Sequence, residues 1–250
     1  MGKEPQGLNP IKKWTCAERA FISIPGTVKQ IINKREQGTD NYVNDVFMRI
    51  KEGDKVSFPE NNVSKCGNII ASAPDRETAI KAAEDAARAM LIRLDPSDLE
   101  TGKFLAKAAK HEENESQFPP DAFQLTDELR DALSQLPKED LEIFTTNHTN
   151  DTNSPFDIEA RVRDGSWLIT PFPEFESSGL TDYMGRTVNE VLDAVRVLTG
   201  LPLPIASENA ENVVRLGRSF WKALIRGGYQ GAVYYIDSLG VLTKKNEGNC

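Results

Sequence analysis

An alanine-rich helical pattern over residues 75–94 constrains the fold of this chain more than any other feature. Asp75 is suited to cap the first turn of such a helix, and Asp95-Pro96 is suited to end it. Residues 68–71 just before it form a short apolar run typical of a strand. Apolar residues hold one face of the expected helix, at Ile80, Ala83, Ala87, Met90, Leu91 and Leu94.

The rest of the first half predicts mostly short strands. We expect strands at residues 27–34, 42–50, 55–58 and 68–71. A short helix is expected at residues 15–24, ending at Pro25-Gly26, and a second at 98–110.

A polar, acidic stretch at residues 111–120 closes on Pro119-Pro120 and indicates a linker. We therefore expect a first region at residues 1–110, a second at 121–242, and a disordered tail at 243–250.

The second half predicts helices at residues 126–136, 187–198 and 207–226; the middle one carries a capping-box pattern, Thr187 with Glu190. Asp164-Gly165 predicts a hairpin between residues 158–163 and 167–170. Residues 171–176 suggest an extended edge segment, and 232–236 a last strand. Strands and helices mix without regular alternation. We expect an α+β fold of antiparallel strands with packed helices, followed by a second small α+β region.

Net charge narrows the possible partners. The 250 residues carry a net charge of −8, which argues against nucleic acid and anionic membrane as partners. The first 35 residues are basic, and residues 111–160 are acidic, either as a solvated linker or as an interaction surface. Three distant cysteines, and no apolar run long enough for a secretion signal or a membrane span, lead us to expect a cytoplasmic protein.

Known catalytic motifs are missing from the sequence. It contains no phosphate-binding loop, nucleophile elbow, Cys-x-x-Cys or His-Glu-x-x-His pattern. His111 and His148 lie in polar stretches, where a solvated histidine is the ordinary case. We expect structural roles for Cys66 beside Lys65, for the paired acids Asp157 and Glu159, and for the glycine-rich run 226–231, read as a helix end.

Two stretches carry a family resemblance. One is Arg19-Ala-Phe-Ile-Ser-Ile-Pro-Gly26, and the other is Asn68-Ile-Ile-Ala-Ser-Ala-Pro-Asp75 with the helix that follows it. Over about residues 15–95 the chain resembles the last subdomain of ATP-grasp enzymes, of the carboxylate–amine ligase, biotin carboxylase or carbamoyl-phosphate synthetase type. The resemblance implies the C-terminal lobe of that fold.

The resemblance also implies ATP and Mg²⁺ as cofactors of a complete enzyme, but it gives this chain no catalytic residue. The metal motif of that family has the pattern Glu-x-Asn-Pro-Arg. Here Asn9-Pro10 keeps the middle pair, while Gly7 and Ile11 stand where the acid and the arginine belong. We therefore expect no metal ligand and no cofactor bound by this chain alone. Lys12, Lys13 and Arg19 in the basic start are the candidates to face phosphate or an anionic substrate.

Three functions follow as hypotheses. The chain is the C-terminal part or a split subunit of an ATP-dependent ligase, working with an ATP-grasp core chain. Alternatively it is a non-catalytic binding or regulatory module, as a stable monomer or a homo-oligomer, or an inert truncated fragment.

Overall fold

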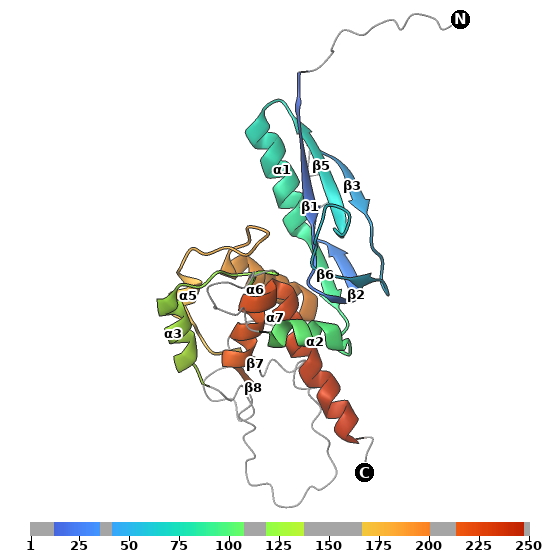
Figure 1. The fold of residues 1–250 in the computed structure, drawn as a ribbon. Helices are drawn as coiled ribbons and strands as arrows, with labels where there is room; N and C mark the ends of the chain where they lie inside the picture. Colours follow the sequence, from blue (N-terminus) through green and yellow to red (C-terminus); the bar gives the residue numbers. More distant parts are fainter. Residues whose placement is uncertain (1–12, 36–41, 108–118, 138–166, 201–213, 248–250) are drawn as a thin grey trace, which may run out of the picture.

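The structure, a computed structural model, describes residues 13–35, 42–107, 119–137, 167–200 and 214–247. We call residues 13–107 the lobe and residues 119–247 the C-terminal region (Figure 1). The lobe contains β1 (Thr15–Phe21), β2 (Gly26–Asn33), β3 (Val43–Met48), β4 (Lys55–Val56), β5 (Gly67–Ala73), α1 (Arg76–Ala89), β6 (Met90–Leu94) and α2 (Leu99–Ala106). The C-terminal region contains α3 (Asp127–Gln135), β7 (Trp167–Ile169), α5 (Pro173–Glu176), α6 (Val188–Thr199), β8 (Val214–Leu216) and α7 (Arg218–Glu247).

Two antiparallel sheets form the lobe, with strand orders β1-β5-β3 and β4-β2-β6. β1 pairs with β5 without interruption, from Thr15 opposite Ala73 to Phe21 opposite Gly67. Burial alternates strictly along β5, so every second side chain faces α1, which covers one side of this sheet. Small residues on both surfaces let helix and sheet approach closely; the buried set on α1 is Ala79, Ala83, Ala86 and Ala87.

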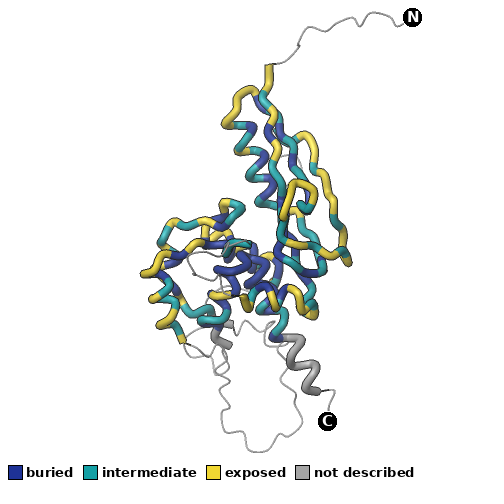
Figure 2. Tube along the Cα trace, in the orientation of Figure 1, coloured by how far each residue is buried: buried dark blue, intermediate teal, exposed yellow. Residues whose placement is uncertain are grey.

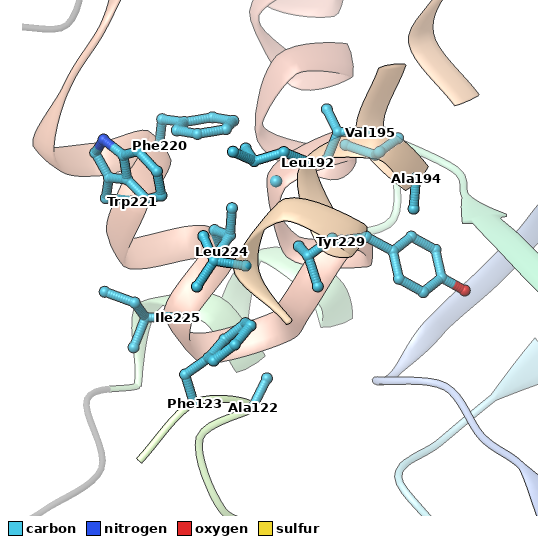
Figure 3. Close-up of a cluster of buried hydrophobic side chains, with 14 of the residues drawn as sticks. Ala122, Phe123, Leu192, Ala194, Val195, Phe220, Trp221, Leu224, Ile225 and Tyr229 are labelled. Atoms are coloured by element: carbon cyan, nitrogen blue, oxygen red, sulfur yellow. The ribbon is translucent and has the colours of Figure 1, made fainter. Parts of the chain in front are cut away.

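The C-terminal region packs around an aromatic centre. Trp221 on α7 meets Phe172 and Phe175 edge to face, with ring centroids 5.8 Å apart in each pair. The indole N–H of Trp221 donates to the carbonyl of Thr170 over 2.7 Å, which satisfies the buried donor. Figure 3 shows Phe220, Trp221 and Leu224 on α7 gathered with Leu192 and Val195 of α6.

α7 is two helices joined at Gly228, whose backbone has φ 60° and ψ −148°. Its second half begins with Tyr229 and Gln230, which reach back to the lobe. The Tyr229 hydroxyl accepts a hydrogen bond from the N–H of Ile92 over 2.9 Å. Its ring points away from Phe220 and Trp221 (Figure 3). Gln230 is 2% exposed; its amide donates to Ile92 O and to Ser23 Oγ, and its carbonyl oxygen accepts from Ile24 N.

These contacts cover the outer edge of β6, which would otherwise present unpaired backbone groups. A bidentate ion pair from Arg93 on β6 to Asp237 on α7, at 2.7 and 2.5 Å, joins the same elements. Figure 2 shows buried segments both in the lobe and in the C-terminal region. The predicted linker falls largely on residues outside the described ranges.

The α+β class is confirmed, and so are several elements. The strands expected at 27–34 and 42–50 are β2 and β3, and the capping box at Thr187 opens α6, which ends at Gly200 with φ 70°. The helix expected at 126–136 is α3, capped by the Thr126 side chain.

Residues 15–24 were expected to be helical, which is wrong. They form β1, because pairing with β5 and burial of Phe21 outweigh the helix preference of Ala, Glu and Arg. The helix expected over 75–94 ends at Ala89, and the remainder is β6. A short apolar run such as Met90–Leu94 satisfies a helical and a buried-strand pattern equally.

Three expectations for the C-terminal region are wrong. The helix expected at 207–226 begins only at Arg218, after β8, and the strand expected at 232–236 is part of α7. Residues 223–234 of α7 are nearly all buried, as in a helix covered on all sides, so no period marks this stretch. The edge segment at 171–176 contains the short helix α5, begun by Pro173. The strand expected at 167–170 is present as β7, which pairs in parallel with β8. Its expected hairpin partner at 158–163 lies outside the described residues, so the hairpin stays a prediction.

Candidate functional site: two pockets beside Arg88

The candidate site is a concave region between α1 and the turn before α6. Two pockets lie there, and Arg88 near the end of α1 lines both. We call them the Arg19 pocket, of about 340 Å³, and the Lys34 pocket, of about 230 Å³. Both combine side chains of the lobe with side chains of the C-terminal region.

The turn Asp182–Arg186 contributes to both pockets: Tyr183, Met184 and Gly185 line the Arg19 pocket, and Arg186 lines the Lys34 pocket. The Gly185 N–H donates to the Asp182 carbonyl, closing a β-turn in which Gly185 has φ 76°. One carboxylate oxygen of Asp182 accepts from the N–H groups of Met184 and Arg186, each at 2.8 Å. The backbone of this turn is thus held by its own aspartate.

Arg186 anchors the turn to both parts of the protein. Its side chain is 5% exposed, lies 3.6 Å from the Asp182 carboxylate, and donates to the carbonyl of Arg88. The guanidinium stacks over the Tyr229 ring at 5.1 Å from its centroid. Burial raises the pKa of Asp182, although Arg186 opposes that shift. Burial likewise raises the pKa of Tyr229 to about 12, so its phenol remains neutral.

The Arg19 pocket is lined by an ion pair between β1 and α1. Arg19 donates to Glu84 through two nitrogens, at 3.0 and 2.9 Å, and both side chains are more than a third exposed. Tyr183, Met184 and Gly185 form its other side. Phe58 packs edge to face on Tyr183, with ring centroids 5.6 Å apart.

The Lys34 pocket lies between matching faces of two helices. α1 contributes Asp85, Arg88 and Ala89, and α6 contributes Glu190, Asp193 and Ala194, both at the i, i+3, i+4 spacing that shares one face. Leu91 and Arg186 complete the floor, and Lys34, which follows β2, stands on the rim.

Two carboxylates of this pocket, those of Glu190 and Asp85, have a pKa below the ordinary value. A backbone hydrogen bond from Thr187 N–H lowers the pKa of Glu190. Burial raises the pKa of Asp85, but hydrogen bonds from Lys81 and Arg88 outweigh that effect and leave it below its ordinary value. The pocket therefore presents fixed charges of both signs.

The structure describes only some of the residues that the sequence suggested for anion binding or catalysis. Lys12 lies outside the described residues, and Lys13 is exposed just before β1. Arg19 lies in a pocket, but six residues of extended chain place it about 20 Å from Lys13. The structure does not bring these two cations together. His111, His148, Asp157 and Glu159 are also outside the described residues.

Cys66 is buried at 1% exposure, and burial raises the pKa of its thiol to about 12, which suits a structural role. The neighbouring Lys65 instead pairs with Glu18 at 2.9 Å.

The first helix of α7 ends in the glycine-rich run 226–231, at Gly228, as expected, although a second helix follows it. An anion has no access at Gly227, because a Cβ there would lie 2.8 Å from Leu105 and 3.0 Å from Ile24. Arg226 is itself neutralised by Asp121 at 2.8 Å and lies over the Phe104 ring.

Sequence reasoning missed Lys34, Arg88 and the turn that builds the site. The usable signal was Asp182 followed by Gly185, since Asp at the first and Gly at the fourth position favour a β-turn. The pairing of this turn with α1 has no local signal.

The residues do not fit a magnesium–nucleotide site. Within the described ranges no three His, Cys, Asp or Glu side chains gather as a metal cage. Arg19, Arg88 and Arg186 are each already paired with a carboxylate. No helix in the described part of the chain is long and apolar enough to cross a bilayer.

Comparisons with known proteins cover the lobe. Residues 20–95 match the family described as L-amino acid ligase C-terminal domain 2. A solved structure, phosphoribosylglycinamide synthetase from Anaerococcus prevotii, is similar at 20% identity over 32% of this chain, with a TM-score of 0.29. The match spans 20% of that chain. No curated protein matches this sequence.

Proposed function

We propose, from the premise that residues 20–95 are the C-terminal subdomain of an ATP-grasp ligase-related protein, that this chain is a part or subunit of such an enzyme. It would serve an ATP-dependent carboxylate–amine ligase whose nucleotide and metal residues lie elsewhere, on the same polypeptide or on another chain. The observation that carries the proposal is the family match over the lobe.

The ion pairs of the lobe support the proposal that the nucleotide and metal residues lie elsewhere. ATP-grasp chemistry transfers a phosphoryl group, and its developing charge needs metal ions and free cations. In the described lobe, Arg19 forms an ion pair with Glu84, and Arg88 forms one with Asp85. ATP and Mg²⁺ would then be bound by the complete enzyme, which we expect to work in the cytoplasm.

A thermal-shift titration with Mg·ATP tests the proposal. Binding to the folded state alone stabilises a protein by about 2.7 kcal/mol at a hundredfold excess over Kd. We expect no shift for this chain alone. We expect a shift, together with ATP-dependent phosphate release, when it is co-expressed with an ATP-grasp core that lacks its own last subdomain.

The outcomes separate the alternatives. A shift with Mg·ATP alone would overturn the claim that the nucleotide residues lie elsewhere. Failure to associate with any such core, combined with a stable defined oligomer, would favour the non-catalytic binding module. Failure to associate combined with concentration-dependent aggregation would favour the inert fragment.

A further inference from the structure

We propose that β3 pairs with the β3 strand of a second copy of this chain, antiparallel about a two-fold axis at Phe47. β3 ends the strand order β1-β5-β3, and Figure 1 shows it at the outer side of its sheet. Pairing at this edge would join the sheets of the two copies into one continuous sheet. The inference names an interface and its partner, and it stands apart from the proposed ligase function.

The outer edge of β3 has backbone groups available for such pairing. The Arg49 N–H donates to the Cys66 carbonyl over 3.0 Å, so Arg49 and, two residues earlier, Phe47 direct their backbone groups toward β5. The intervening Val46 and Met48 therefore direct their N–H and carbonyl groups away from the sheet. No strand in the described part of the chain pairs with this side of β3.

The side chains along this edge complement those of a second copy. A two-fold axis at Phe47 places Asp45 opposite Arg49 of the second copy, and the same pair recurs on the other side of the axis. Both charged residues are exposed, and neither has an ion-pair partner among the residues that the structure describes. Phe47, which is 50% exposed, meets its counterpart on the axis. Val46 packs against Met48 of the second copy, a residue that is 42% exposed in one copy alone.

The regular part of the edge fixes the register. A bulge just before Asp45 interrupts the ladder with β5 at one end, and residues 51–54 form a turn at the other. Phe47 is the centre of the stretch 45–49 that remains. Moving the axis by one residue in either direction would leave Arg49 opposite an apolar side chain, so only the axis at Phe47 pairs both charges. β3 also contains no proline or lysine, the residues that commonly protect an edge from pairing.

Sedimentation equilibrium of the full chain, from about 10 μM to about 1 mM, tests for the dimer. An edge this short covers less than the roughly 1,000 Å² of a stable complex, so we expect a weak dimer with a Kd of about 100 μM. Raising NaCl from about 0.05 M to about 0.5 M should weaken it about threefold, because the charge pairs are exposed. A monomer at about 1 mM would overturn the proposal and leave this edge to a strand of a different protein.

Two charge reversals test the register. Asp45→Arg alone places two guanidinium groups opposite each other, and Arg49→Asp alone places two carboxylates opposite each other; each should weaken the dimer at least about tenfold. An equimolar mixture of the two variants restores unlike pairs at both ends and should associate as the parent does. Asp131→Arg, on exposed α3, is the control and should leave the association unchanged. Unchanged association of both single variants, or no recovery in the mixture, would overturn the proposal.

A disulfide cross-link locates the axis. Residues directly opposite each other in a pair without mutual hydrogen bonds have Cα atoms about 4.5 Å apart, a distance that a disulfide spans. Phe47→Cys, in a chain that also carries Cys16→Ser and Cys250→Ser, should therefore form a covalent dimer with oxidised glutathione at least about tenfold faster than a control. The control is Val63→Cys in the same background, at a residue that is 76% exposed and lies outside β3. Equal rates for the two variants would overturn the proposal.

Discussion

Gly231 illustrates how a single missing side chain lets α7 fold back on itself. A Cβ at this position would lie 2.1 Å from the carbonyl oxygen of Ala223, a backbone atom that cannot turn away. The bend at Gly228 is what brings these two turns together. Glycine is thus required at Gly231 for space and at Gly228 for its positive φ.

Gly231→Ala should lower the free energy of unfolding by about 1–3 kcal/mol, because overpacking forces the two halves of α7 apart. The measurement is the urea midpoint at unchanged m-value. Gly53→Asn is the control, since nothing lies within 4 Å of a Cβ there and Asn tolerates positive φ. Equal midpoints for Gly231→Ala and the parent would contradict the close approach.

Gln230 links the C-terminal region to the lobe through the hydrogen bonds of a single side chain. Its one amide group completes hydrogen bonds to Ser23, Ile24 and Ile92. Gln230→Met, similar in shape, would leave the buried Ile24 N–H and Ile92 carbonyl without these partners and should destabilise the protein by about 1–3 kcal/mol. The same change at exposed Gln135 should cost less than about 0.5 kcal/mol. Chemical denaturation of both variants decides whether the hydrogen bonds matter.

At the scale of elements, α2 is fastened to β2 through its own cap. Asp98 accepts from the N–H of Glu100 at the helix start and from the Thr27 hydroxyl at 2.6 Å. The hydrogen bond from Thr27 is the main cause that lowers the pKa of Asp98. A folded pKa below the unfolded one stabilises the fold above the unfolded pKa, and that stability is lost as pH falls through the folded pKa.

Thr27→Val should therefore return the pKa of Asp98 toward that of a free aspartate, about 3.9. It should also flatten the acid limb of the stability–pH curve. An NMR titration of the Asp98 carboxyl carbon reports the first effect, and unfolding between about pH 2 and 5 reports the second. The pKa of Asp75, which caps α1 on its own, should not move in this variant.

Local signals predicted elements wherever the ends of the element were marked. Asp75 and Thr187 cap helices as expected, and Gly200 ends one. Local signals failed where apolar residues follow one another: Met90–Ile92 and the stretch 232–236 are apolar on successive residues, so neither period shows. The pockets could not be predicted, because Arg88 and Glu190 lie far apart in sequence and meet only through tertiary packing.

At the scale of the molecule, the buried pair Arg93–Asp237 couples the unfolding of the lobe to that of the C-terminal region. The side chain of Arg93 is 21% exposed and that of Asp237 is 9% exposed. Loss of one partner would therefore leave the other charge largely buried and unpaired. Arg93 also donates to the carbonyl of Leu198 at the end of α6. Lobe, α6 and α7 thus meet at one guanidinium.

Arg93→Met should destabilise the protein by about 3–5 kcal/mol, because it leaves Asp237 buried and unpaired. Adding Asp237→Leu should recover part of that loss, which a double-mutant cycle measures. Unfolding followed by far-UV dichroism and by tryptophan fluorescence should coincide in the parent, as in a two-state transition. Two separate transitions in the parent would show that the lobe unfolds by itself.

β6 contributes side chains to two hydrophobic cores. Met90, Ile92 and Leu94 belong to the core of the lobe, whereas Leu91 belongs to the core of the C-terminal region. Because successive strand residues face opposite sides, a shift of one position would exchange the two sets. Excising residues 20–95 as a module, for fusion or for recombination with another enzyme, would remove β6 from the core of the C-terminal region. Leu91 would then face water, and the edge of β6 would need a new cover.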